Sequence, residues 1–122
     1  MVVAAASGLY DIVLGAALLA GRGLLTALFD ISAPSPPIHA DLNGLFLLAI
    51  GAGYVLPFRR PDRYRGYVWV MGPFLKGFGC LAFLADHFVR HSPPAYLVFA
   101  AADGSLALVT FWALWITRAR TP

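Results

Sequence analysis

Residues 2–20 are VVAAASGLYDIVLGAALLA, a mostly apolar stretch with a single acid, Asp11, near its middle. A helix of this length rises about 28 Å, at about 1.5 Å per residue, and so nearly matches a hydrocarbon core of about 30 Å. No Lys or Arg precedes the apolar run and Asp11 interrupts it, which is unlike a cleaved secretory signal. We therefore interpret the stretch as a retained transmembrane span.

The rest of the chain continues this pattern. Its 122 residues are 60% hydrophobic and only 12% charged, a balance far from that of a soluble domain. The charges gather in short segments and leave long apolar stretches between them. We predict an all-α, polytopic membrane protein: one four-transmembrane-helix bundle over residues 1–122, with spans at about 2–20, 36–57, 67–88 and 94–117.

The helix starts are marked more clearly than the end of the first span. The second and fourth spans each follow a Ser-Pro-Pro sequence, at residues 35–37 and 92–94, in which serine is a good N-cap and proline suits the first turn. At the end of the first span, Gly21, Arg22 and Gly23 loosen the helix. The following residues either extend a long tilted span to about residue 29 or lie in the outer interface, and the sequence leaves both open.

The arginines predict the orientation. The link between spans two and three and the C-terminal tail carry six cations, whereas the other two loops carry Arg22 and Arg90. By the positive-inside rule this bias predicts N-in, C-in topology, in the cytoplasmic (inner) membrane. The six inner cations are Arg59, Arg60, Arg63, Arg65, Arg118 and Arg120.

Three charged residues lie near the middle of spans, where an unpaired charge costs several kcal/mol. Asp11 and Lys76 each lie about nine residues from the cytoplasmic end, so we expect them to form an ion pair. Asp103 lies nearer the outer leaflet, at a level that Arg22 reaches if its side chain bends. If the first helix is continuous, Asp11 and Arg22 share one face, which is lined by the small residues Ala4, Gly8 and Gly15.

The third span contains a helix breaker next to its lysine. Residues 72–79 are GPFLKGFG, and Pro73 cannot donate to the carbonyl of Trp69, so we predict a kink there. One interpretation is a flexible polar point that binds a ligand or a proton. The other is a kinked helix in which Asp11 neutralises Lys76 for structural reasons.

A second polar cluster is predicted at the outer rim, from residues of spans two and three. Histidine and carboxylate side chains suit zinc, but the spacing matches no metal motif, so we predict solvated interfacial residues and no metal site. The single cysteine, Cys80, excludes an intrachain disulfide. The rim residues are His39, Asp41, Asn43, Asp86 and His87, with Arg90 and His91 beside them.

No catalytic or phosphate-binding motif is present in the sequence, so we predict no catalytic residues. The basic link at residues 59–65 sets topology and touches anionic lipid, and we expect no nucleic-acid partner.

Two patterns carry a family resemblance: Tyr10-Asp11-x-x-x-Gly15 in the first span and LNGLFLLAIG at residues 42–51 in the second. With four spans and a basic link into the third, the chain resembles the DoxX-like small four-helix bacterial membrane proteins. That resemblance implies an association with quinone-linked redox systems. It assigns no role to any residue.

Three function classes follow. We favour a non-catalytic accessory or structural subunit that packs in a larger redox or energy-transducing membrane complex, in contact with lipid, other subunits or a second copy. The alternative is a small proton-coupled transporter or a binder of a lipophilic, quinone-like ligand that uses Asp11, Lys76 and Asp103. A membrane enzyme acting on a quinone or lipid is third. The cofactor is not identified; contact with lipid, quinone or pigment fits the apolar surface.

Overall fold

The computed structural model describes residues 2–29 and 38–118, and among these every regular element is helical. The N-terminal half contains α1 (Val2–Ala20), α2 (Arg22–Phe29), α3 (Ile38–Gly53) and α4 (Val55–Arg59). The C-terminal half contains α5 (Arg65–Trp69), the π-helical turn η1 (Val70–Phe74), α6 (Leu75–Arg90), the 3-10 turn η2 (Pro94–Tyr96) and α7 (Leu97–Thr117).

These elements join into four helices that are long and apolar enough to cross a membrane, at Val2–Ala20, Ile38–Arg59, Arg65–Arg90 and Pro94–Thr117. The predicted all-α class and the four long apolar helices are therefore confirmed. The predicted N-cap Ser35 lies outside the described residues. Ser92 does not cap α7, because its hydroxyl donates to the Asp86 carboxylate and η2 begins at Pro94.

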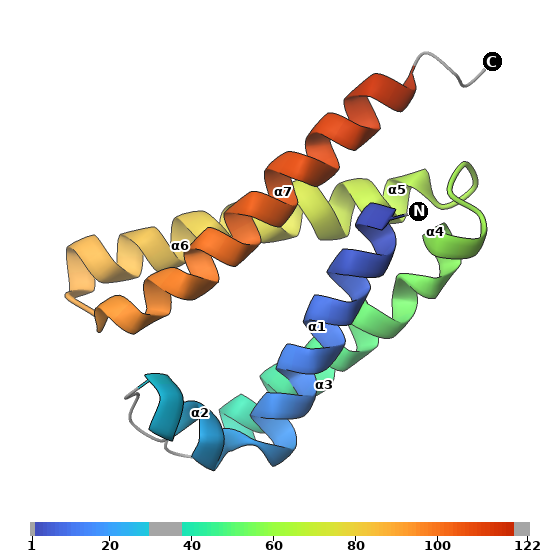
Figure 1. The fold of residues 1–122 in the computed structure, drawn as a ribbon. Helices are drawn as coiled ribbons and strands as arrows, with labels where there is room; N and C mark the ends of the chain where they lie inside the picture. Colours follow the sequence, from blue (N-terminus) through green and yellow to red (C-terminus); the bar gives the residue numbers. More distant parts are fainter. Residues whose placement is uncertain (1, 30–37, 119–122) are drawn as a thin grey trace.

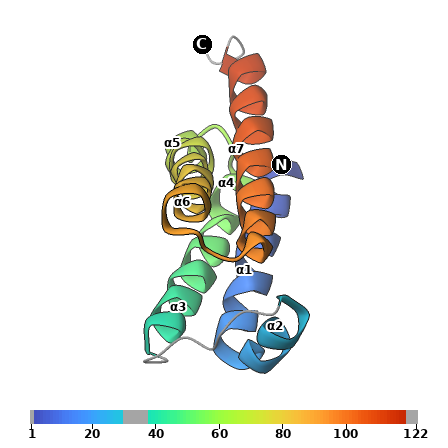
Figure 2. The ribbon, with the colours of Figure 1, turned by 90° about the vertical axis from the view of Figure 1, so that its left-hand side faces the viewer.

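The four helices form two antiparallel hairpins. Figure 1 shows α1 beside α3 in the first hairpin and α6 beside α7 in the second, with the α4–α5 connection between them. The second view looks nearly along α5 and α6 and shows α7 from the side, so α7 crosses α6 at an oblique angle (Figure 2). The hairpins touch each other where α1 meets α7 and where α4 meets α5.

The first hairpin is held by glycines that face each other. A Cβ atom built on Gly15 would lie 2.7 Å from the carbonyl oxygen of Gly44, and one built on Gly51 would lie 2.8 Å from that of Gly8. Such distances leave no room for a side chain, so the two backbones are in direct contact. The stripe of small residues predicted on the first span is confirmed, since Ala4, Gly8 and Gly15 are all buried on one face of α1.

The first helix ends where the sequence loosens. α1 stops at Ala20, the Gly21 N–H donates to the carbonyl of Ala17 at 2.8 Å, and α2 starts at Arg22 as a separate helix. Figure 1 shows α2 turning away from the line of α1. The shared face of Asp11 and Arg22 required a continuous helix, so that argument does not hold.

Two prolines interrupt the regular helices. Pro73 lies inside η1, where the backbone switches to π-helical hydrogen bonding immediately before Lys76. The predicted disturbance near Trp69–Gly77 is therefore present as a π turn, while its bend angle stays a prediction. At the other break, the Tyr54 N–H donates to Gly51 rather than to Ile50, and Pro57 follows inside α4.

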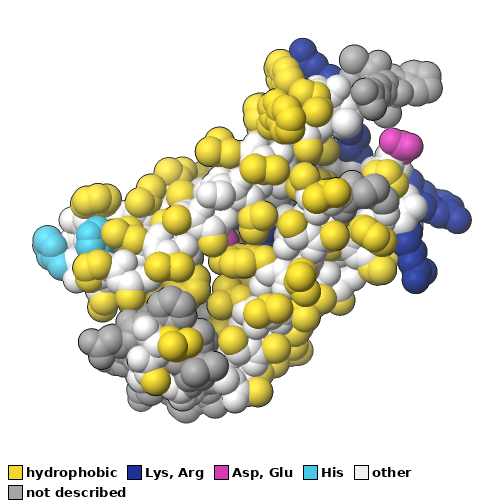
Figure 3. Space-filling view, in the orientation of Figure 1, with side chains coloured by type: hydrophobic (Ala, Val, Ile, Leu, Met, Phe, Trp, Pro, Cys, Tyr) yellow, Lys and Arg dark blue, Asp and Glu magenta, His cyan; other side chains and the backbone are white. Residues whose placement is uncertain are grey.

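The outer surface is mostly apolar. Figure 3 shows hydrophobic side chains over the hairpins, basic residues gathered at the α4–α5 end and histidines at the far end of α6. Leu9, Phe74, Phe88 and Leu108 each expose more than 60% of their surface. An apolar surface of this extent suits lipid better than water.

Candidate functional site

An ion pair joins the two hairpins. The Lys76 Nζ of α6 lies 2.6 Å from the Asp11 Oδ1 of α1, and the two side chains expose 5% and 1% of their surface. The pair expected from the depth of these residues is therefore present. Because both partners are buried, neither charge is screened by water, and each depends on the other.

Local sequence places both partners at the interface. Asp11 lies on the small-residue face of α1, where Ser7, Gly8 and Gly15 are also buried. Lys76 comes two residues after the π turn, and an extra residue in one turn rotates all later residues by about 100° relative to a regular helix. The π turn at Pro73 therefore helps to set the direction in which Lys76 points. Lys76 is the one buried residue of α6.

Two further polar side chains surround this pair. The Lys76 Nζ lies 5.2 Å from the centre of the Tyr10 ring, within the range of a cation–π interaction. Asp103 of α7 faces the same group and interacts electrostatically with Lys76, Asp11 and Tyr10. Its carboxylate fits against Gly79, where an added Cβ atom would lie 2.9 Å from Oδ2. Gly79 thus leaves the space that Asp103 occupies.

These groups line a cavity of about 440 Å³ between the hairpins. In Figure 3, acidic and basic atoms are visible near the middle of the view, surrounded by hydrophobic side chains. Asn43, predicted at the outer rim, lines this cavity. The polar lining is Tyr10, Asp11, Asn43, Lys76, Tyr96 and Asp103, and the remaining wall is Leu14, Leu18, Phe46, Leu47, Ile50, Leu75, Gly79, Phe83 and Phe99.

The charges of this lining do not balance. Among the described residues of the cavity, two carboxyl groups, on Asp11 and Asp103, face one ammonium, on Lys76. Asp11 Oδ2 is also buried without a hydrogen-bond partner among the described residues. An uncompensated buried charge costs several kcal/mol, so the site favours one bound proton or one bound monovalent cation.

The other predicted residues lie elsewhere. Arg22 begins α2, and its side chain lies outside the described part of the structure. At the end of α6, Asp86 accepts from Ser92 and pairs with Arg90 at 3.4 Å, while His87 Nδ1 lies 2.9 Å from the Ser92 carbonyl oxygen. These contacts close the C-terminus of α6.

The predicted rim cluster forms no metal centre within residues 2–29 and 38–118, which contain no group of three His, Cys, Asp or Glu side chains placed to hold a metal ion. His39 and Asp41 lie in the first turn of α3, on the other hairpin. The histidine and carboxylate residues of the two spans therefore contribute to two separate helix ends.

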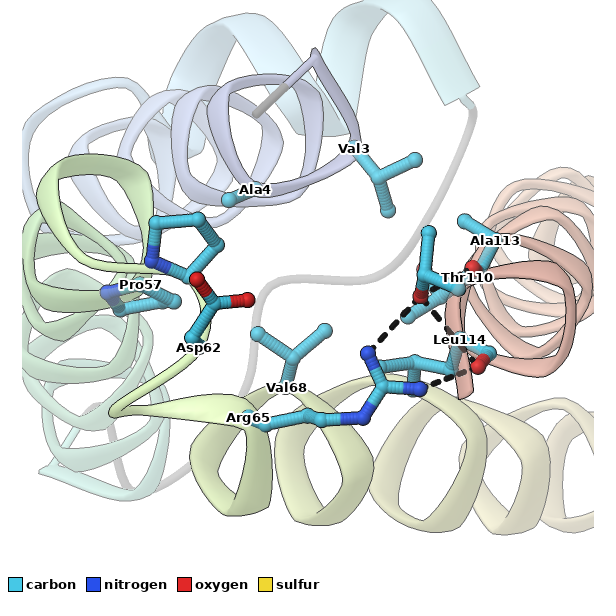
Figure 4. A pocket seen from close by; sticks show the side chains of 11 residues that line it. Val3, Ala4, Pro57, Asp62, Arg65, Val68, Thr110, Ala113 and Leu114 are labelled. Carbon is cyan, nitrogen blue, oxygen red and sulfur yellow. Dashed lines mark hydrogen bonds between the residues drawn. The ribbon is translucent and has the colours of Figure 1, made fainter. Parts of the chain in front are cut away.

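A second, smaller cavity of about 300 Å³ lies at the basic end. Figure 4 shows Arg65 reaching from α5 to α7, where its guanidinium donates to the Thr117 hydroxyl at 2.8 Å and to the Leu114 carbonyl oxygen. These bonds satisfy acceptors at the C-terminal end of α7. The sequence assigned Arg65 to orientation alone, and its structural contact depends on how α5 crosses α7.

Sequence reasoning also missed Tyr10 and the aromatic wall of the main cavity. The signal for Tyr10 was its place next to Asp11, but helix rotation decides which neighbours of a buried acid share its cavity.

No protein-family model, curated protein or solved structure matches the chain.

Proposed function

We propose that this chain is a multi-pass protein of the cytoplasmic (inner) membrane that binds a small lipophilic ligand in the cavity between its hairpins. One observation carries the proposal: the buried Asp11–Lys76 pair lies in the wall of a cavity of about 440 Å³ whose other walls are mainly apolar. Ligand sites have a similar lining, mainly apolar with a few polar groups that fix orientation, and this one is an open groove between the hairpins. A pair that served helix packing alone would need no such space.

Insertion and orientation belong to the same proposal. The four apolar helices supply the spans, and the arginines at the α4–α5 end supply the inside-facing charge, for N-in, C-in topology. A reporter inserted near Asp62 is expected to read cytoplasmic, and one inserted between Ser32 and Pro36 is expected to read external. An external signal from the Asp62 insertion would reverse the orientation.

A second candidate is an accessory subunit in a larger membrane complex. It is favoured by an exposed aromatic row on one face of α5 and α7, formed by Trp69, Phe111 and Trp115. Trp69 and Phe111 meet edge to face at 5.6 Å, and Phe111 stacks on Trp115 at 5.9 Å. Such rows suit a neighbouring protein as well as lipid.

Thermal unfolding in a neutral detergent distinguishes these candidates. A cavity-lining residue, Leu47, and an exposed residue of the same helix, Leu45, provide a matched pair of variants. If the cavity is a binding site, a panel of lipophilic quinones, cations and anions contains at least one compound that raises Tm, Leu47→Trp removes the rise, and Leu45→Trp keeps it. A panel without any effect, together with a stable partner in co-purification, would favour the accessory subunit.

A further inference from the structure

The main cavity has one carboxylate more than its lysine can neutralise. Lys76 is already bound to Asp11 at 2.6 Å, so Asp103 is the acid without a dedicated cation among the described residues of the cavity. Asp103 lies on a different helix from Asp11, and the Gly79 surface gives its carboxylate room. It is partly exposed, whereas Asp11 is fully buried. Asp103 is therefore the carboxylate that an incoming ligand can reach.

Aromatic rings stand on the Asp103 side of the cavity. The Phe83 ring of α6 lies 5.6 Å from the Phe99 ring of α7, and Tyr96 lies 6.3 Å from Phe99. Phe99 precedes Asp103 by four residues, one helical turn, so ring and carboxylate share a face of α7. Phe83, Tyr96, Phe99 and Asp103 line the same cavity, and aromatic rings together with an acid suit an organic cation.

From this geometry we infer the ligand class: a lipophilic monovalent cation, with its charge beside Asp103 and its apolar body against Phe83, Tyr96 and Phe99. The inference rests on the proposed ligand-binding function and makes it more specific. One positive charge, supplied by a bound proton or by a cationic ligand, balances the two carboxylates and one ammonium of the cavity. An anion would raise the imbalance, and a neutral quinone would leave it unchanged.

Two probes of the same shape and opposite charge test this inference. Tetraphenylphosphonium and tetraphenylborate are both monovalent, both tetraphenyl-substituted, and suited to titration calorimetry on the purified full chain in a neutral detergent. The phosphonium is expected to bind and to raise Tm, whereas the borate is not. Equal binding of both ions would overturn the inference, because size and apolar area alone would then explain it.

Asp103→Asn keeps the shape of the side chain and removes its charge. We expect it to raise the Kd of the phosphonium by about ten- to a hundredfold, the value of losing one charge-assisted contact. Asp86→Asn is the matched control, since Asp86 lies at the end of α6 outside the cavity, and its Kd should stay at the wild-type value. An unchanged Kd in Asp103→Asn would overturn the inference.

A second variant covers the case in which Asp103→Asn does not fold. Phe99→Leu keeps the apolar volume and removes the aromatic face, so Kd should rise several-fold while the control Phe88→Leu, exposed at 71%, leaves it unchanged. If a quinone analogue such as decylubiquinone binds and the phosphonium does not, the inferred cationic ligand class is wrong, but the proposed ligand-binding function still holds. If none of the three probes binds, the inference and the proposed function both fall.

Discussion

The two hairpins solve the problem of close helix packing in different ways. In the first, Gly8 and Gly15 of α1 face Gly51 and Gly44 of α3, and backbone meets backbone. In the second, glycines meet side chains: Gly72 faces Thr110, Gly79 faces Asp103 and Gly104 faces Cys80. The first hairpin is closed by backbone contacts that leave little freedom. In the second, the Asp103 carboxylate and the Cys80 thiol can rotate, whereas the Thr110 Cβ atom that meets Gly72 is fixed to the backbone.

This difference explains where the polar groups lie. The rigid hairpin contributes one charged residue, Asp11, on a face that small residues fix. The second contributes Lys76, two residues after a π turn, and Asp103, against a glycine. π turns inside α-helices often mark functional sites, because the backbone can change register there at modest cost. We therefore interpret α1 and α3 of the first hairpin as the fixed wall of the site, and α6 and α7 of the second hairpin as its adjustable wall.

Cutting the link between the hairpins should have the largest effect. Lys76→Met leaves the Asp11 carboxylate buried without its partner, so we expect a loss of about 3–5 kcal/mol in unfolding free energy. Asp11→Asn combined with Lys76→Met should recover much of this loss, because no charge is then stranded. The measurement is a double-mutant cycle of unfolding in mixed micelles. Additive losses without recovery would mean that the two residues act independently.

Overpacking the glycine contacts of the first hairpin should have the second-largest effect on stability. A Cβ atom on Gly51 would lie 2.6 Å from Ile12 Cγ1 and 2.8 Å from the Gly8 carbonyl oxygen, and a backbone atom cannot move aside alone. Gly51→Ala should therefore cost about 1–3 kcal/mol by overpacking, despite the higher helix propensity of alanine. Gly66→Ala is the matched control, since nothing lies within 4 Å of its added Cβ. Equal stability of the two variants would refute direct backbone contact.

Removing a hydrogen bond at the hinge, the break between α3 and α4 at Tyr54, should have a smaller effect on stability. The Tyr67 hydroxyl donates to the Ile50 carbonyl oxygen, which the Tyr54 N–H leaves free by bonding to Gly51. Tyr67→Phe strands this carbonyl and should cost about 1 kcal/mol, the net value of one hydrogen bond. Tyr64→Phe, at the start of α5, removes a hydroxyl that makes no such bond and serves as the control. No difference in Tm between the two would show that the bond does not hold the hinge.

The sequence predicted most of the helices and, within the site, the Asp11–Lys76 pair. The long apolar stretches, the small-residue face of α1 and the matching depth of Asp11 and Lys76 are local or one-dimensional features, and periodicity reveals them. The placement of Asp103 and Asn43 in one cavity is different in kind. Asp103 lies on α7 and Asn43 on α3, so their meeting depends on how the two hairpins are placed against each other, which residue spacing does not give.

The predicted reach of Arg22 toward Asp103 stays a prediction, because the Arg22 side chain lies outside the described part of the structure. The predicted shared face of Asp11 and Arg22 required a continuous first helix, and the structure ends that helix at Ala20. Glycines at residues 21 and 23 signalled weakness at this point, but weak propensity does not say whether tertiary contacts will hold a helix together. The insertion, orientation and family resemblance stay predictions that need their own experiments.

The smallest effect on stability should come from the adjustable wall, and it should appear in binding. A Cβ atom on Gly79 would lie 2.9 Å from Asp103 Oδ2, the end of a side chain that can rotate away, and alanine gains up to about 1 kcal/mol of helix propensity over glycine. Gly79→Ala should therefore leave the unfolding free energy within about 0.5 kcal/mol of wild type. Its displaced carboxylate should still weaken phosphonium binding several-fold.

Gly77→Ala supplies the control on the same helix, because its added Cβ would meet only Ala107, at 4.0 Å. It should leave binding unchanged and raise the unfolding free energy by up to about 1 kcal/mol, the gain in helix propensity. Calorimetric titration and thermal unfolding of both variants show whether weaker binding comes from a moved Asp103 carboxylate or from a loss of stability. If Gly79→Ala loses stability as Gly51→Ala does, the second hairpin is packed as tightly as the first, and the distinction between a fixed and an adjustable wall has to be given up.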